Sequence, residues 1–252
     1  MKQRYYSNIY WHFTGSPKDV DWGRCRKPKD ILLQGKPRPP EEALQALFAI
    51  LESKKLLATC TERISEKLST QRFCCVTDIP LMDLALHRQY YGAVALGFNC
   101  SRIHAEFTPV LYFPSQRLPR KTHIPDGGRE LIVDDFDDID THEFDAEQLS
   151  DGRFRLTLKG SQLLLFATEI QSDSIDRYFL DHLKITNFSP SIGESFYQER
   201  EWRHTGDFVF DGKSIEAVIV PRQLKTRAQE FMLSSDDFAQ ASVLTWEFLR
   251  QA

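Results

Sequence analysis

The amino-acid sequence predicts an α+β protein, and three observations point to this class. Hydrophobic residues make up 41% of the chain and charged residues 27%, which are globular rather than disordered or coiled-coil proportions. Apolar residues follow a period of two in some segments and helical spacing in others. No repeat or low-complexity linker divides the 252 residues, so we expect a single domain over residues 1–252.

Strands are predicted where short runs of β-branched, aromatic or other apolar residues lie between turn formers. The first run ends at the turn formers of residues 14–17, which places His12 and Thr14 at a strand end. The predicted strands are residues 9–13, 73–77, 93–98, 107–113, 195–204, 207–210, 215–220 and 243–249.

Helices are predicted where apolar residues recur three and four positions apart. Glu41 and Glu42 place negative charge on a first turn, where the helix dipole favours it. Asp78, shortly before Pro80, has the chemistry of an N-cap, and Gly92 ends the helix that follows. The predicted helices begin near Glu41, Asp78, Ser161, Ser174 and Pro221.

Two charged segments of opposite sign interrupt this pattern. Residues 18–40 form a basic, proline-containing loop, whereas residues 134–151 contain no Lys or Arg. The acidic residues belong to a variable middle segment, about 115–160, where the apolar pattern is weakest. Both segments are also compatible with plain solvated connections.

The basic loop holds the local candidates for contacting nucleic acid, which are Arg24, Arg26, Lys27 and Lys29. A net charge of −4 and a pI near 6.0 argue against a protein that is basic as a whole. Contact with nucleic acid is therefore expected only through this local segment.

Several classes of protein lack support in the sequence. The longest apolar runs are far shorter than the about 20 residues of a membrane-spanning helix, and no apolar signal core follows the N-terminus. The five cysteines form an odd set without C-x-x-C spacing, and the seven histidines include no H-E-x-x-H pair, so no metal is expected. Gly-rich nucleotide-binding signatures are absent. We expect a cytoplasmic protein without a membrane partner.

The first candidate site is the strand end at His12 and Thr14. A neutral His provides one directed hydrogen bond, and a residue two positions further on shares its face of a strand. This arrangement suits a ribose hydroxyl or an amide. Alternatively, both side chains only bind neighbouring backbone groups.

The second candidate site joins residues 73–78 to the helix end at Tyr91 and Gly92. An aromatic ring beside a glycine offers a flat face with close backbone access, as stacking on a planar ring requires. The adjacent Cys74 and Cys75 are interpreted as core residues, because Cys is commonly buried and the local sequence offers nothing to depress a thiol pKa.

The third candidate site is Glu199, Glu201 and Arg203, which alternation along a strand places on one face. Two neighbouring carboxylates raise each other's pKa, and a nearby Arg keeps one of them ionised. Such a carboxylate stabilises an oxocarbenium ion while the other orients a nucleophile. The alternative is a charged edge strand held by cross-strand ion pairs.

The three blocks W-H-F-T-G, F-C-x-V-T-D-I-P-L with H-x-x-Y-Y-G, and F-Y-Q-E-R-E-W-R together resemble the AbiGi family over about residues 8–220. The order and approximate spacing of all three blocks agree. The resemblance implies a role in abortive phage infection or in a toxin–antitoxin pair, with a cognate toxin or antitoxin as partner.

A more distant resemblance is to ADP-ribosyltransferases, and it implies a split β-sheet that binds NAD as a substrate without a Gly-rich loop. Glu201 would then be the catalytic carboxylate, and Glu199 would contact a protein or nucleic-acid acceptor. The residues that would bind NAD are His12, Thr14, Gly15, Tyr91, Thr77 and Arg203.

The central block departs from the transferase pattern, because it has no Ser-Thr-Ser signature. Phe73 or Thr77 therefore competes with Tyr91 for the place of the stacking residue. The resemblances leave two functions open: an NAD-using effector that modifies an acceptor or hydrolyses NAD, and a non-enzymatic antitoxin or binding module with the same fold.

Overall fold

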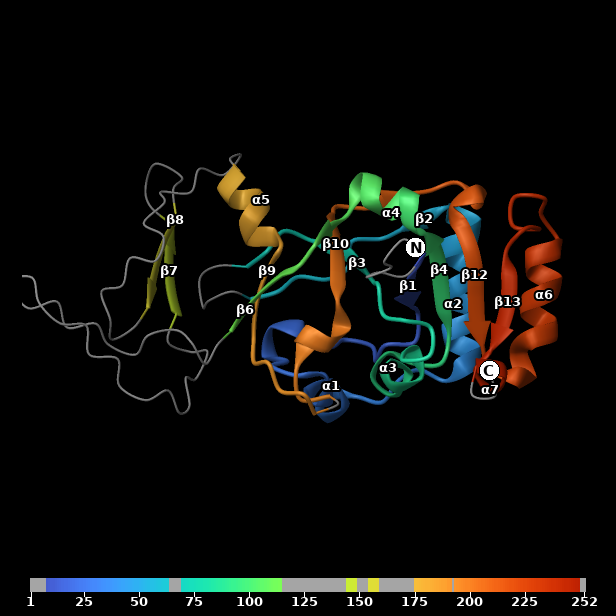
Figure 1. Cartoon of the computed structure of the whole chain (residues 1–252), viewed down its shortest axis with the longest axis horizontal. Helices are drawn as coiled ribbons and strands as arrows, with labels where there is room; N and C mark the ends of the chain where they lie inside the picture. Colours follow the sequence, from blue (N-terminus) through green and yellow to red (C-terminus); the bar gives the residue numbers. More distant parts are fainter. Residues whose placement is uncertain are drawn as a thin grey trace, which may run out of the picture.

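The computed structural model describes residues 8–63, 69–114, 144–148, 154–158, 175–191 and 193–249. Within these residues, one seven-stranded sheet organises the chain (Figure 1). Its strands are β1 (Ile9–Phe13), β3 (Phe73–Thr77), β4 (Ala95–Asn99), β5 (Thr108–Pro109), β10 (Glu201–Thr205), β12 (Ile215–Val220) and β13 (Ser242–Thr245). The strand order is β13-β12-β4-β1-β3-β10-β5, and only the β12 and β13 neighbours run parallel.

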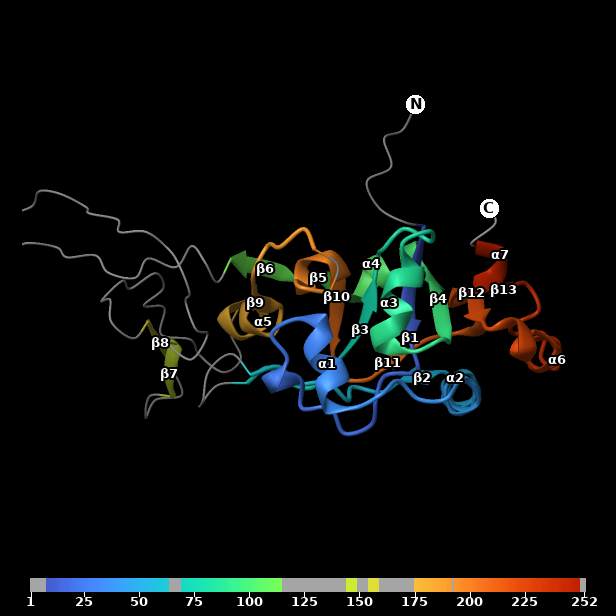
Figure 2. The same cartoon turned by 90° about the horizontal axis from the view of Figure 1, so that it is seen from below.

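Short strand pairs and helices complete the described chain. The pairs are β2 (Lys55–Leu56) with β11 (Phe208–Val209), β6 (Leu111–Pro114) with β9 (Leu183–Thr186), and β7 (Phe144–Gln148) with β8 (Phe154–Leu158). The helices are α1 (Pro28–Gln34), α2 (Pro40–Ser53), α3 (Leu84–Tyr91), α4 (Cys100–Glu106), α5 (Ile175–Asp181), α6 (Lys225–Leu233) and α7 (Trp246–Leu249). In two perpendicular views, β6, β9 and α5 lie beyond the β10 end of the sheet, opposite α6 (Figures 1 and 2).

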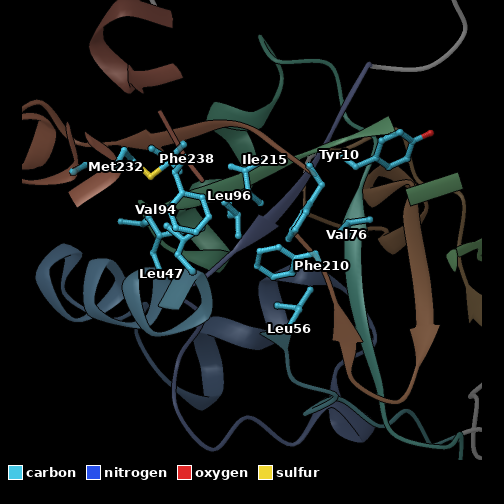
Figure 3. Packing of buried hydrophobic residues seen from close by; sticks show 14 of the residues in the cluster. Tyr10, Leu47, Leu56, Val76, Val94, Leu96, Phe210, Ile215, Met232 and Phe238 are labelled. Atoms are coloured by element: carbon cyan, nitrogen blue, oxygen red, sulfur yellow. The ribbon is translucent and has the colours of Figure 1, made fainter. Parts of the chain in front are cut away.

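Strand alternation divides the core between the two faces of the sheet. One face carries Leu96, which belongs to the same buried cluster as Leu47 of α2 (Figure 3). The neighbouring Ala95 faces the other side and packs in a second cluster with Trp11 and Trp246. Leu47 is fully buried, and a buried leucine of this kind stabilises the fold by roughly 1.5–3 kcal/mol.

Strands β1 and β3 separate after a single residue pair. Trp11 of β1 lies opposite Thr77, and Thr77 in turn lies opposite Glu201 of β10. At the far end of β3, Phe73 instead forms an isolated bridge with Cys60. Strands β1 and β3 are therefore paired at Thr77 and are no longer paired at Cys75.

Three predicted strands, residues 9–13, 73–77 and 215–220, are confirmed as β1, β3 and β12. The expected strand 93–98 is confirmed as β4, shifted to residues 95–99. These segments are short, rich in β-branched, aromatic and other apolar residues, and lie near turn formers, a combination that favours strands. The mixed helix and sheet content agrees with the predicted α+β class.

The predicted strand 195–204 is wrong in its first half. Residues Phe196–Glu199 form a 3-10 helix, and Arg200 has a φ of 48°, so β10 begins only at Glu201. A left-handed residue turns the chain and cannot continue a strand.

Other predicted boundaries are wrong for similar reasons. Residues 107–113 divide into β5 and β6, residues 243–249 change from β13 to α7 at Trp246, and the helix predicted over 174–185 ends at Asp181 before β9. The predicted strand 207–210 is reduced to β11. The helix predicted from Ser161 lies outside the described residues.

Two interpretations in the first half of the chain also need correction. Asp78 is not a helix cap, because α3 starts at Leu84 and the Asp78 carboxylate lies 2.5 Å from Arg200 Nε. The basic connection of residues 18–40 is not a plain loop, since it contains α1 with Pro28 in its first turn.

Candidate functional site: a buried charge cluster

The site is centred on Glu201, the first residue of β10, which is only 7% exposed. Arg203, two residues further on the same face, is fully buried beside it. Arg203 Nε donates to Glu201 Oε1 at 2.8 Å and Nη2 donates to Oε2 at 3.2 Å. This bidentate geometry is the strong form of a carboxylate–guanidinium pair.

A second cation reaches Glu201 from strand β9. Lys184 Nζ donates to Glu201 Oε2 at 3.1 Å and lies 4.1 Å from the centre of the Phe196 ring. Glu62 accepts a hydrogen bond from Arg203 Nη2, and its carboxylate lies 3.9 Å from Lys184 Nζ. We call Glu62, Lys184, Glu199, Glu201 and Arg203 the charge cluster.

The charge cluster holds Glu201 as an anion. Burial opposes ionisation of its carboxyl group, but the charges and hydrogen bonds of Arg203 and Lys184 outweigh burial and lower its pKa to about 2. Burial alone lowers the pKa of Lys184, yet the surrounding carboxylates raise it above its usual value. The ions therefore stabilise each other's charged forms in a place that excludes water.

Glu199 behaves differently from Glu201, although both are buried. Burial, together with the negative charge of Glu201, raises the pKa of Glu199 to about 7 despite the opposing charge of Lys184. The Tyr91 hydroxyl donates to Glu199 Oε1, and the Thr77 hydroxyl donates to the Glu199 carbonyl. The pKa of Glu201 thus lies well below neutral pH, whereas the pKa of Glu199 lies close to it.

Tyr91 reaches the charge cluster through a close contact between two glycines. The Gly15 N–H donates to the Tyr91 carbonyl at 3.1 Å, and Gly92 follows Tyr91 with a φ of 89°. A Cβ added at Gly92 would lie 2.5 Å from the Gly15 Cα. Only glycine permits this approach, which joins the first sequence block to the second.

The side chains of His12 and Thr14 form hydrogen bonds outside the charge cluster. His12 Nδ1 lies 2.9 Å from the Cys75 carbonyl, so this nitrogen carries the proton and donates it, while burial lowers the pKa of the ring. The Thr14 hydroxyl donates to the Ala43 carbonyl at 2.8 Å. Strand alternation also places His12 on the face opposite Trp11 and therefore opposite Glu201.

The structure thus places the predicted site residues in two groups. It brings Glu199, Glu201, Arg203, Thr77 and Tyr91 together, with the Gly15 backbone behind Tyr91. It leaves the side chains of His12 and Thr14 bonded to backbone carbonyls, which is the alternative that sequence analysis had left open.

The charge cluster does not lie on an edge strand, because β5 pairs with β10 on its outer side. The ion pairs also differ from the cross-strand arrangement considered above. Glu201 pairs with Arg203 of its own strand and with Lys184 from outside the seven-stranded sheet.

Three residues of the site, Glu62, Lys184 and Tyr112, were not predicted from the sequence. The Tyr112 hydroxyl accepts a hydrogen bond from the Glu201 N–H at 2.7 Å. In β9 the alternate residues Lys184 and Thr186 are the buried ones, whereas Leu183 is half-buried. Because polar residues face inward there, the apolar pattern gave no sign of the site.

The four basic candidates near α1 are only partly available to a ligand. Lys27 Nζ and Lys29 Nζ lie 2.7 and 2.5 Å from the two carboxylate oxygens of Glu194, and Arg24 Nε lies 3.1 Å from Asp21. Arg26 is exposed. Glu194 therefore balances one of the two lysine charges, and Asp21 pairs with Arg24.

The fold and the charge cluster define an α+β protein whose candidate site is built from carboxylates and cations. Among the described residues, no group of three or more His, Cys, Asp or Glu side chains is arranged to hold a metal ion, and no helix is long and apolar enough to cross a membrane.

Comparison with family models places the chain more specifically. Residues 53–238 match the family described as "Putative abortive phage resistance protein AbiGi, antitoxin", and the chain belongs to this family. The matched span contains the second and third sequence blocks and the whole charge cluster, while the His12 block precedes it. No curated protein and no solved structure matched the chain.

Proposed function

We propose that the chain is a phage-defence effector that uses NAD to transfer ADP-ribose to a protein or nucleic-acid acceptor, or to water. One observation carries this proposal. Three blocks far apart in the sequence meet at the adjacent strands β1, β3 and β10. The carboxyl groups of Glu199 and Glu201, whose pKa values differ, lie at the end of β3 where Thr77 pairs with Trp11, and β1 separates from β3 one residue pair further on, at Cys75. A split sheet with a late Glu pair is what the transferase resemblance implies.

The two carboxyl groups suit the two halves of such a reaction. As the bond between ribose and nicotinamide breaks, nicotinamide leaves with the electron pair and positive charge develops on the ribose, where the Glu201 carboxylate stabilises it. The acceptor oxygen or nitrogen then bonds to the ribose carbon, and its proton passes to ionised Glu199. A carboxyl with a pKa of about 7 is suited to this proton transfer.

This chemistry requires Glu201 to face the substrate. Both of its oxygens contact cations, Oε1 through Arg203 and Oε2 through Arg203 and Lys184. We propose that Lys184 moves away from Oε2 when NAD binds, and that Arg203 alone then keeps Glu201 ionised. Lys184→Met therefore raises activity or leaves it unchanged, whereas Arg203→Met lowers it.

Incubation of the purified protein with NAD carrying a labelled adenylate, with and without cell extract, tests the activity. The expected results are release of nicotinamide and, when an acceptor is present, transfer of label. Glu201→Gln lowers the rate by about 10²–10³, because the amide keeps the size of the side chain and loses its charge. Glu42→Gln is the matched control, since Glu42 is an exposed residue whose carboxylate pairs with the exposed Lys18.

The result is interpreted together with a thermal melt of each variant, because Glu201 is also part of a buried ion pair. A folded Glu201→Gln protein with wild-type activity would remove Glu201 from the mechanism. If the folded wild-type protein neither binds NAD nor releases nicotinamide, with or without extract, the enzymatic proposal fails.

The second candidate function is a non-enzymatic antitoxin that binds a cognate toxin. The specific observation in its favour is the word antitoxin in the description of the matched family. Co-expression separates the two functions: an antitoxin relieves the toxicity of its partner, and Glu201→Gln preserves this relief if the variant folds. An NAD-using effector is toxic by itself, and the same variant abolishes the toxicity.

A further inference from the structure

Two cysteines meet where β1 separates from β3. Cys60 and Phe73 exchange backbone hydrogen bonds of 3.1 and 2.9 Å, so their side chains share one face. Cys75 lies two residues after Phe73 and on the same face, which makes it the diagonal neighbour of Cys60. Cys75 lies between the Cys60–Phe73 bridge and the pair of Thr77 with β1. Its carbonyl accepts the hydrogen bond from His12.

This diagonal position brings the Cys60 and Cys75 thiols close together, and all five cysteines of the chain are free. The Cys75 thiol lowers the pKa of Cys60 although burial opposes the change, and the Cys60 thiol together with burial raises the pKa of Cys75 well above its usual value. Cys60 is half-buried and lies between the exposed residues Thr59 and Thr61. The Cys60 thiol is thus suited to attack an oxidant, and the Cys75 thiol lies beside it.

We propose that Cys60 and Cys75 form a modification site for hydroperoxides, which oxidise the pair to a disulfide. In the first step the Cys60 thiolate attacks the peroxide O–O bond, so that Cys60 becomes a sulfenic acid and the other oxygen leaves as water or an alcohol. In the second step the Cys75 sulfur attacks Cys60 Sγ, the sulfenic oxygen leaves as water with the Cys75 thiol proton, and one S–S bond forms. Two thiols are oxidised and one hydroperoxide is reduced.

The disulfide would act on the charge cluster through Glu62. This residue lies two positions after Cys60, and its carboxylate binds Arg203 and approaches Lys184. A bond from Cys60 to Cys75 ties this segment covalently to β3, directly opposite Arg203 in the β10 register. Oxidation therefore holds Glu62 against the two cations that pair with Glu201. The inference concerns the thiols and does not depend on the proposed NAD chemistry.

Treatment of the reduced, full-length protein with hydrogen peroxide, followed by blocking of the remaining thiols and tryptic digestion, tests the proposal. Cleavage at Lys55 and Arg63 places Cys60 in peptide 56–63, while cleavage at Arg72 and Arg88 places Cys75 in peptide 73–88. The expected product is these two peptides joined, with the mass of the intact chain lower by two hydrogens. Dithiothreitol reverses the change.

Cys74 provides the matched control, because it lies in the same peptide on the opposite face, with Sγ 3.8 Å from the His204 carbonyl. Cys74→Ser retains the linked peptides, and Cys60→Ser and Cys75→Ser lose them. In Cys75→Ser, a sulfenic-acid trap labels Cys60. Linkage through Cys74, or alkylation of Cys60 no faster than that of Cys100 in the wild-type protein, would overturn the proposal without requiring a variant to fold.

Discussion

Replacing Arg203 by Met tests whether the charge cluster stabilises the fold. Arg203 is fully buried and donates to Glu201, to Glu62 and to the Asp181 carbonyl. Removing one partner of a buried ion pair typically costs about 3–5 kcal/mol, because the remaining charge is left without compensation. Glu201 keeps Lys184 as a partner at 3.1 Å, so we expect the lower end of this range.

The measurement is the free energy of unfolding from urea denaturation, supported by thermal melts. A loss of about 3 kcal/mol corresponds to a decrease of roughly 6–12 °C in Tm for a chain of this size. Lys18→Met is the control. Lys18 forms an ion pair with Glu42, and their side chains are 66% and 50% exposed. Exposed ion pairs contribute about 0–1 kcal/mol to stability.

The double variant, Glu201→Gln with Arg203→Met, measures the interaction energy between Glu201 and Arg203. Because each single change leaves an opposite charge behind, the double change costs less than the sum of the two, by about 0.5–3 kcal/mol. If Arg203→Met costs no more than Lys18→Met, the charge cluster does not stabilise the fold. Strict additivity of the two single changes would likewise show that the residues do not interact.

Two further predictions concern Glu199 and the glycine contact. The pKa of Glu199 is raised from 4.5 to about 7, so its contribution to stability is fully present below pH 4.5 and is lost as the pH rises through 7. Glu199→Gln removes this part of the pH dependence in urea denaturation, and an unchanged profile would contradict the raised pKa. Gly92→Ala costs about 1–3 kcal/mol more than Gly206→Ala, because both have a positive φ but only the Gly92 Cβ meets the Gly15 backbone. Equal costs in the same assay would exclude a role for that contact.

Much of the sheet could be predicted because its evidence is local. The strands at residues 9–13, 73–77 and 215–220 are apolar runs bounded by turn formers, and the alternation that defines a strand repeats every two residues. The convergence of Glu201 and Arg203 on one face follows from the same period. Gly92 similarly predicted the end of α3.

Partners from distant parts of the chain could not be predicted in this way. Glu62 and Arg203 are separated by 141 positions, and Tyr91 and Glu199 by 108, so no local pattern relates them. Lys184 was not predicted as a site residue, because a buried lysine does not follow the apolar pattern of a strand. Its burial is explained only by its carboxylate partners, which lie in other parts of the chain.

The local pattern of the sequence predicted strands β1, β3, β4 and β12 and placed Glu201 and Arg203 on one face of a strand. The charge states of the two carboxyl groups depend instead on contacts between distant parts of the chain. Glu199 and Glu201 are the same residue type two positions apart, yet Arg203 and Lys184 bind Glu201 while burial beside Tyr91 governs Glu199. A pKa depends on the charges and solvent around a group in space, and these were set by strands β3, β9 and β10 coming together.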